Sequence, residues 1–416
     1  MTDSVTSPLG VEPPAGWELH QISDLCVKIG SGATPKGGSA VYVSNGVNFI
    51  RSQNVFDHRF SEAGMVCIDD LAARKLSGVE VEHRDVLLNI TGDGDTIARC
   101  CVTPGHVLPA RVNQHVMILR ANDRLVPEYL QRYLSQPSMR AFMLSHNSGG
   151  SRRALTKGQV AGFQVLLPPR GAQQSVADML GVLDDKIAVN EHIAATARSL
   201  GMAIFVQAAQ GDGAVDVGVD SVAFALTRGV APKYSDDPDE LIVLNQKCIR
   251  DGRVNLAPAR RTLGEKVKSP KLLHRNDVLV NSTGVGTLGR VARWTSDSEA
   301  TVDSHVTIVR FDAQQVDPVC AGFAMLRAQP DIEAMGEGST GQTELRRAQV
   351  GGLEITLPSP SRQRELRVKL DSLEDRADQA LAESAALAAL RDTLLPQLMS
   401  GRIRVKDAEK IVEDHV

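Results

Sequence analysis

The sequence has few cysteines, no long hydrophobic run and no excess of positive charge. Its six cysteines form no C-x-x-C pair and its ten histidines form no H-E-x-x-H motif, so neither a disulfide framework nor a zinc site is expected. No apolar stretch approaches the roughly 18 residues that a membrane-spanning helix needs. Residues 1–15 are polar and contain proline, which predicts a loose N-terminal arm rather than a secretory signal. These absences favour a reduced, cytoplasmic protein.

Motifs for common nucleotide-dependent reactions are also missing. There is no G-x-x-x-x-G-K-[ST] loop to hold ATP. Pro13-Pro14 and Pro168-Pro169 lack the acid or amide and the aromatic residue that base-amino methyltransferases carry at such a pair. A nuclease centre beginning at Pro238-Asp239 would lack its second carboxylate, because Asn245 stands where a metal ligand is needed. We therefore expect no catalytic residue, no cofactor and no metal.

One glycine-rich segment needs separate treatment. Gly284 to Gly289 fits G-x-G-x-x-G, and an apolar run precedes it. A dinucleotide site needs a helix after these glycines, whereas Arg290 to Trp294 has the pattern of a strand. The segment is therefore interpreted as a tight turn that allows backbone or DNA to approach closely.

The charge is uneven along the chain. The formal net charge is -4, which alone does not favour a nucleic-acid binder. Residues 241–310, however, carry 12 Lys/Arg against 6 Asp/Glu, a local net charge of +6. Residues 361–399 carry 6 Lys/Arg against 7 Asp/Glu. Positive charge is thus concentrated in one region, as a binding face requires.

The sequence contains an internal repeat with a period of about 190 residues. Asp85 to Gly92 recurs as Asp277 to Gly284, and each block is followed by an arginine, Arg99 or Arg290. Further blocks recur in the same order: Val112 to Val116 as Val302 to Val306, Leu155 to Pro168 as Leu345 to Pro358, and Asp184-Asp185-Lys186 as Glu374-Asp375-Arg376. The order and the nearly constant offset indicate a duplication.

Each copy has a β-rich part followed by a long helix. Short apolar runs such as Val86 to Ile90 and Val278 to Val280 predict strands separated by turns. After Pro168-Pro169 and after Pro358, apolar residues recur with a period near 3.5, which is typical of helices that pair as a coiled coil. Asn190 interrupts the first seam and could fix its register. Helices of about 35 residues at ~1.5 Å per residue would span about 50 Å.

Several segments resemble one known family when they are taken together in order. They are Gly16-Trp17-Glu18-Leu19, Gly32-Ala33-Thr34-Pro35, Ile50-Arg51-Ser52-Gln53-Asn54, Asp85 to Gly92, Leu244-Asn245-Gln246-Lys247-Cys248-Ile249 and Leu394-Leu395-Pro396-Gln397-Leu398-Met399-Ser400-Gly401. From about Trp17 to Val405 the chain resembles the specificity subunit of type I restriction–modification systems. The opening of the second copy lacks a counterpart of Trp17-Glu18-Leu19, which leaves its exact start open.

The resemblance implies a non-catalytic subunit that reads a two-part double-stranded DNA site. Its helices would dock two methyltransferase subunits and, through them, ATP-dependent nuclease–translocase subunits of a phage-defence complex. The implied fold is α+β, with two duplicated target-recognition domains of short twisted sheets and small helices, separated by two long antiparallel helices in a coiled coil. The expected divisions are an arm (1–15), domain 1 (16–169), helix 1 (170–210), domain 2 (211–358), helix 2 (359–400) and a tail (401–416).

Base readout needs side chains that form paired hydrogen bonds with base edges, and affinity needs cations on phosphates. Polar, glycine-containing segments between apolar runs supply candidates in both copies. The predicted DNA-binding residues are Lys36, Arg51, Gln53, Asn54, Arg152, Arg153 and Lys157 in the first copy, and Gln246, Lys247, Arg250, Arg253, Gln342, Arg346 and Arg347 in the second. The matching His115 and His305 are better explained by a structural hydrogen bond than by catalysis.

A second hypothesis remains open from the residues alone. The chain could be a duplicated scaffold whose long helices bind protein partners and whose globular parts bind protein or carbohydrate. Such a scaffold would show no specific, salt-sensitive binding to duplex DNA, whereas a reader would.

Overall fold

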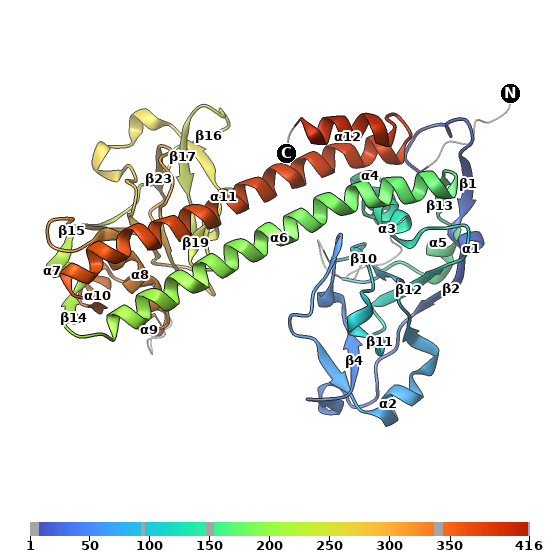
Figure 1. Ribbon diagram of the computed structural model, residues 1–416, viewed down its shortest axis with the longest axis horizontal. Coiled ribbons are helices and arrows are strands. Elements are labelled where there is room, and N and C mark those ends of the chain that lie inside the picture. The colour runs from blue at the N-terminus through green and yellow to red at the C-terminus, as the bar shows by residue number, and fades with distance from the viewer. Residues whose placement is uncertain (1–7, 93–95, 147–153, 337–343, 415–416) are drawn as a thin grey trace. The chain divides into compact units, whose positions relative to one another are not determined.

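The computed structural model describes residues 8–92, 96–146, 154–336 and 344–414. They form two compact units, one of Met1–Ala188 with Ser384–Val416 and one of Val189–Glu383. Each unit holds one copy of the repeat and part of both long helices, α6 (Arg170–Ala209) and α11 (Pro360–Met399), which are labelled in Figure 1. The predicted α+β fold with two modules and two long helices is confirmed.

The first module is built on a four-stranded antiparallel sheet with the order β10-β9-β12-β2. A second sheet has the order β3-β7-β4-β11-β8, and its β4 and β11 pair in parallel. The strands are β1 (Glu18–Gln21), β2 (Cys26–Ser31), β3 (Tyr42–Val43), β4 (Val47–Ile50), β5 (Val55–Phe56), β6 (Arg59–Phe60), β7 (Val66–Ile68), β8 (Glu80–Val81), β9 (Val86–Asn89), β10 (Cys100–Val102), β11 (Ala110–Val112), β12 (Val116–Ala121) and β13 (Gln164–Leu167). The helices of this unit are α1 (Ile22–Leu25), α2 (Asp70–Lys75), α3 (Pro127–Ser135), α4 (Pro137–Ser145), α5 (Lys157–Gly162) and, after α11, α12 (Val405–Glu413).

The second module repeats this topology, except that among the described residues its second sheet has no counterpart of β8. Its sheets have the orders β22-β21-β24-β15 and β16-β20-β17-β23, and β17 and β23 are again parallel. The strands are β14 (Val215–Gly218), β15 (Ala223–Arg228), β16 (Tyr234–Ser235), β17 (Leu241–Leu244), β18 (Ile249–Arg250), β19 (Arg253–Val254), β20 (Arg260–Thr262), β21 (Val278–Asn281), β22 (Val291–Arg293), β23 (Ala300–Val302), β24 (Val306–Phe311) and β25 (Glu354–Leu357). The helices are α7 (Val219–Val222), α8 (Pro318–Arg327), α9 (Gln329–Met335) and α10 (Arg347–Gly351). The duplication seen in the sequence is therefore also a duplication of fold.

The central strands explain why the repeat is easy to detect. Every residue of β9 and of β21 is buried, so both faces of each strand contact other elements of the module. The apolar side chains of these strands pack against the second sheet of the module on one face and against small helices on the other. Burial on both faces favours continuous runs of β-branched and leucine residues. The Val-Leu-Leu-Asn and Val-Leu-Val-Asn segments follow this rule.

The second module begins with a strand that has no sequence counterpart in the first. β14 pairs with β25 from Val215 opposite Leu357, just as β1 pairs with β13 from Glu18 opposite Leu167. Both opening strands lie at the rim of the module and are largely exposed or half-buried. An exposed strand places few demands on its side chains, so the pairing repeats although Trp17-Glu18-Leu19 does not.

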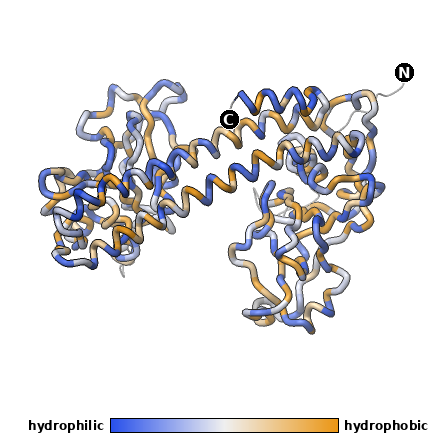
Figure 2. Tube along the Cα trace, in the orientation of Figure 1, coloured by the Kyte–Doolittle hydropathy of each residue, from blue (hydrophilic) through white to orange (hydrophobic). Residues whose placement is uncertain are grey.

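Within each unit the two long helices pack antiparallel. In the first unit Asp184 of α6 accepts a hydrogen bond from Arg391 of α11 (2.7 Å), and Ile187 accepts one from Ser384. In the second unit Arg198 of α6 donates to Asp378 of α11 at 2.8 Å. Partners later in α6 meet partners earlier in α11, as an antiparallel pair requires. Hydrophobic and hydrophilic residues alternate along both helices in Figure 2.

The seam between the helices changes character along its length. In the first unit it contains large apolar side chains, including Leu180, Leu183 and Leu387. In the second unit a layer of short side chains follows, made of Ala194, Ala197, Ala377 and Ala380. Asn190 is 1% exposed, and its amide nitrogen has no hydrogen-bond partner among the described residues. A buried amide inside an otherwise apolar seam disfavours shifted registers, as the sequence suggested.

Candidate nucleic-acid interface

Three loops of each module meet at the end of its central strand. In the first module the side-chain amide of Asn89 donates to Ser52 O (3.0 Å) and Thr96 O (3.1 Å). In the second module Asn281 donates to Gln246 O (3.0 Å) and Thr287 O (3.1 Å). Both asparagines are fully buried. Each one therefore joins a short 3-10 segment, η2 (Ser52–Asn54) or η5 (Gln246–Cys248), to the glycine-containing loop that follows the strand.

The residues just before α5 and α10 are joined by backbone hydrogen bonds to the residues that follow the central strand. Leu155 N donates to Ile90 O, and Leu345 N donates to Ser282 O, both at 2.8 Å. Isolated bridges pair Thr91 with Ala154 and Thr283 with Glu344. The loop that precedes α5 or α10 is thus attached beside the other two. The arrangement is the same in both modules, while the side chains displayed on it differ.

The most strongly repeated sequence blocks begin with an aspartate that holds the central strand of each module in place. Asp85 accepts two hydrogen bonds from Arg120, both at 2.9 Å, and Asp277 accepts two from Arg310 at 2.7 and 2.6 Å. Both carboxylates are 1% exposed. Bidentate pairing of this kind compensates for burial of a charge. The repeated aspartate at the start of β9 and β21 is therefore structural.

The matching histidines also hold the loops in place. His115 Nδ1 hydrogen-bonds the Thr91 hydroxyl, and His305 Nδ1 lies 2.8 Å from the Thr283 hydroxyl. Each threonine follows the central strand of its module. These contacts confirm that a structural hydrogen bond accounts for the two histidines.

The predicted residues of the first module divide into displayed and supporting side chains. Lys36, Gln53 and Lys157 are exposed. The guanidinium of Arg51 is only partly exposed, because it donates to Gly64 O and lies 5.7 Å from the centre of the Tyr42 ring. Arg152 and Arg153 lie outside the described residues. Arg51 is consequently a supporting residue, whereas Gln53 is exposed although its amide nitrogen also donates to Gly64 O (3.3 Å).

The prediction that Asn54 contacts DNA is wrong. Asn54 is fully buried, its Oδ1 accepts from Arg51 N (2.9 Å), and its Nδ2 donates to Ser61 O (2.9 Å). An amide that is buried and bonded on both atoms cannot reach a base edge. In the second module Cys248 occupies the equivalent place and accepts from Asn245 N through sulfur.

In the second module the cations are displayed more openly. Lys247, Arg250, Arg346 and Arg347 are exposed, and Arg253 is partly exposed. Gln342 lies outside the described residues. The Gln246 amide nitrogen donates to Thr283 O at 2.7 Å and to the Thr283 hydroxyl at 2.5 Å. Paired hydrogen bonds to adenine need both amide atoms of a glutamine. The nitrogen of Gln246 is already used, so only its oxygen is left for an outside partner.

The interface also contains cations that the sequence analysis did not select. A concave surface in the first module is lined by Arg51, Ser52, Gln53, Phe56, Thr96, Arg99 and Asn113. In the second module Arg228 donates to Glu344 (3.0 Å) and Leu345 O (2.8 Å), beside the start of α10. Arg99 had a signal in the sequence, since it recurs as Arg290. Arg228 had none, because its counterpart before the repeated glycine is Ser31.

The glycine-rich turn of the second module is structural, as expected. Gly284, Gly286 and Gly289 have φ values of +105°, +74° and +80°. A β-carbon on Gly289 would lie 2.6 Å from Glu333 Cα. Strand β22 follows the turn, so there is no helix start to hold a pyrophosphate.

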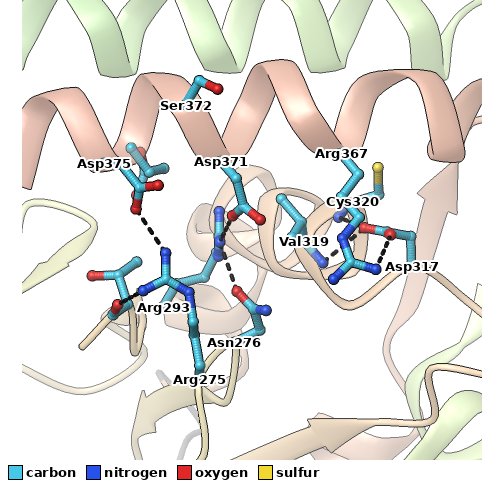
Figure 3. Close-up of polar contacts among 12 residues, drawn as sticks. Arg275, Asn276, Arg293, Asp317, Val319, Cys320, Arg367, Asp371, Ser372 and Asp375 are labelled. Carbon is cyan, nitrogen blue, oxygen red and sulfur yellow. Dashed lines mark hydrogen bonds and ion pairs between the residues drawn. The ribbon is translucent and has the colours of Figure 1, made fainter. Parts of the chain in front are cut away.

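Each module is fixed to the long helices by arginine–carboxylate pairs, but by different routes. In the second unit Arg293 on β22 donates to Asp371 of α11 (3.0 Å) and to Asn276 (2.8 Å), and Arg275 donates to Asp375 (2.6 Å). Figure 3 shows these arginines pointing from the module toward α11. Arg293 is 2% exposed and lies 5.4 Å from the centre of the Phe323 ring.

In the first unit the cation comes from a helix of the module instead. Arg132 on α3 forms an ion pair with Asp184 of α6, which also binds Arg391. Arg132 Nη1 lies 2.7 Å from His58 Nδ1 in the turn between β5 and β6. Burial and the positive charge of Arg132 lower the pKa of His58 to about 3. A neutral imidazole therefore connects this hairpin to the helix pair.

The described residues contain neither a metal-binding cluster nor a membrane-spanning helix. Among the described residues, no group of three His, Cys, Asp or Glu side chains could hold a metal ion. No helix in that part of the chain is long and apolar enough to cross a membrane.

Comparison with known proteins agrees with this architecture. Residues 14–197 match the model of the type I restriction modification DNA specificity domain. A type I restriction–modification S subunit from M. genitalium is similar over 95% of this chain and 99% of its own, with 13% identity and a TM-score of 0.61. The HsdS subunit from Thermoanaerobacter tengcongensis covers 94% of this chain and 99% of its own at 14% identity, with a TM-score of 0.38.

Residues 14–197 are thus similar to a DNA specificity domain of the type I restriction–modification kind. The family model covers the first module, and the second module repeats its fold. The fold of the chain is similar to that of a solved type I S subunit, which agrees with the resemblance seen in the sequence motifs.

Proposed function

We propose that this chain reads a two-part site in duplex DNA, one half with each module, and that it has no catalytic centre of its own. The observation that carries the proposal is the pair of equivalent loop clusters around Asn89 and Asn281. A shared scaffold with different displayed side chains is what two readers of different half-sites require. The displayed groups, such as Gln53 in one module and Lys247 in the other, suit base edges and phosphates.

We further propose that the paired helices dock two methyltransferase subunits and, through them, ATP-dependent nuclease–translocase subunits in the cytoplasm. Unusually exposed apolar side chains on the helices support this part of the proposal. Val182 is 65% exposed, Leu200 is 48% exposed and Val368 is 70% exposed. Exposed apolar side chains mark a docking surface only where they form a contiguous patch, so these three residues are the positions at which docking should be tested.

The test is methylation of a randomised two-part DNA library by the chain assembled with its methyltransferase partner. Lys247→Ala and Arg250→Ala should alter only the second half-site, and Gln53→Ala only the first. A base contact loses about 1–3 kcal/mol of discrimination at one position, whereas a phosphate contact weakens all sites and lowers the salt slope by about one.

Two results would contradict the proposal. Mutants in both modules that relax the same half-site would rule out two separate readers. A wild-type complex that binds duplex DNA without specificity or salt dependence would favour the scaffold alternative. Methyl transfer by the isolated chain with S-adenosylmethionine would show that it has a catalytic centre.

A further inference from the structure

Arg99 in the first module has a tightly fixed backbone. Asn89 N donates to Arg99 O, and Ala98 N donates to Asn89 O, both at 2.9 Å. Ala98 is fully buried and adopts φ +65°, whereas Gly289 occupies the equivalent place in the second module with φ +80°. A left-handed alanine is strained and persists only where its surroundings fix it. The strain lies directly before Arg99.

The Arg99 side chain is fixed by an aromatic ring. Its guanidinium carbon lies 4.9 Å from the centre of the Phe56 ring, and the guanidinium carbon of Arg59 lies 5.2 Å from the same centre. No carboxylate of the described residues forms an ion pair with Arg99. The nearby Asp57 carboxylate is bound to Arg140 (2.8 Å) and to Cys100 N (3.1 Å). The Asp57 carboxylate attracts the charge of Arg99 through space, but its oxygens are bound to these other groups, so the N–H groups of Arg99 are not paired with it.

The fixed guanidinium lines the concave surface described above, together with Gln53, Thr96 and Asn113. A guanidinium that lies over a ring restricts its own movement and can still donate hydrogen bonds through its N–H groups. A planar donor fork of this kind matches the O6 and N7 acceptors of guanine in the major groove. A flexible surface arginine would instead serve as a phosphate contact.

The second module lacks this device although it has an arginine at the same place. Arg290 donates to Gly286 O in its own loop (2.8 Å), and Arg250 stands where Phe56 does. The ring-held arginine is therefore a property of one reader and not of the shared fold.

We propose that Arg99, positioned by Phe56, recognises one guanine in the half-site of the first module. The inference rests on the proposed DNA-reading function and names a residue that determines its specificity. Gln53 lines the same surface.

The experiment profiles methylation of a randomised two-part library by the assembled complex. The variants are Arg99→Ala, Arg99→Lys and Phe56→Leu, with Arg290→Ala as the matched control in the other module. Arg99→Ala should reduce preference for guanine at one position of the first half-site by about 5- to 150-fold. Arg99→Lys keeps the charge but loses the paired contact, so it should lose most of that preference. Phe56→Leu should give a smaller loss at the same position.

The outcomes separate this inference from the proposed function. If the wild-type complex methylates no two-part site, the proposed function itself fails. If it does, and the folded Arg99 variants weaken all sequences equally or leave the first half-site unchanged, the guanine contact is wrong. A change at that position in Arg290→Ala would also overturn the inference. Should Arg99→Ala fail to fold, Arg99→Lys, which retains the aliphatic stem, decides the matter by the same criteria.

Discussion

At the scale of single residues, the modules depend on polar side chains that are buried for structural reasons. Asn54 and Asn89 lie beside displayed DNA-binding candidates and Asp85 lies at the opposite end of β9, yet the polar atoms of all three are used inside the module. If the modules read DNA as proposed, this burial fixes the loops beforehand and lowers the entropy cost of forming base contacts. Removing one of these side chains would disturb readout indirectly, through the shape of the loop.

His58 offers a prediction about pH. Its folded-state pKa is about 3, below the ordinary value of 6.5. Between these two pH values the imidazole is protonated in the unfolded chain and neutral in the folded chain. The contribution of this group to stability is therefore complete above pH 6.5 and is lost as pH falls toward 3, by up to about 1.4 kcal/mol per pH unit.

The measurement is urea unfolding of the first unit across this pH range. His58→Asn is a suitable variant, because residue 58 has φ +66° and asparagine tolerates that conformation. The variant should lose less stability on acidification than the wild-type protein. Parallel pH profiles for the two proteins would show that His58 is not held neutral.

At the scale of elements, equivalent close approaches occur beside the first long strand of each module. A β-carbon on Gly32 would lie 2.2 Å from Val112 O, and one on Gly229 would lie 2.1 Å from Val302 O. Gly32→Ala and Gly229→Ala should each destabilise their own unit by about 1–3 kcal/mol, because the backbone must move. Thermal unfolding measures the loss.

Gly30→Ala is the matched control for this pair. Gly30 lies on β2, and nothing stands within 4 Å of the β-carbon it would gain. This variant should change stability by no more than about 0.5 kcal/mol. Equal losses at residues 30 and 32 would contradict the close approach to Val112.

The elements also show what a sequence can and cannot reveal. The long helices were predictable, because prolines precede them and apolar residues recur along them at the period of a paired helix. Strand β14 was not, because an exposed rim strand constrains hydrogen bonding and hardly any side chains. The burial of Asn54 depends on its hydrogen bond to Ser61 O, seven residues further along the chain. The proposed role of Arg99 depends on the ring of Phe56, 43 residues away in sequence. Such contacts leave no local pattern.

At the scale of the whole molecule, the long helices are the covalent connection between the two units. We predict that matched insertions of seven residues, after Ala188 in α6 and after Glu383 in α11, preserve the helix pairing. Seven residues add about 10 Å of helix, equal to about three base pairs of DNA. The gap between the half-sites should lengthen by that amount, while both half-sites stay unchanged.

Methylation mapping on a randomised-gap library checks this prediction. An insertion of the same length after Asp236, in an exposed segment between β16 and β17, is the control and should leave the gap unaltered. An active double-insertion variant that keeps the original gap would show that the helices do not set the spacing.

The different routes by which the modules reach the helices restrict how repeats could recombine. In the first unit the cation is Arg132 on a module helix and the adjacent strand carries Val102. In the second unit the strand carries Arg293, and Gly322 and Phe323 make room for it on the helix. A chimera with β22 and α3 would place the guanidiniums of Arg293 and Arg132 side by side. A chimera with β10 and α8 would have neither arginine to pair with the facing aspartate. Viable chimeras should therefore inherit the strand, the small helix and the facing carboxylate as one block, and exchange loops freely.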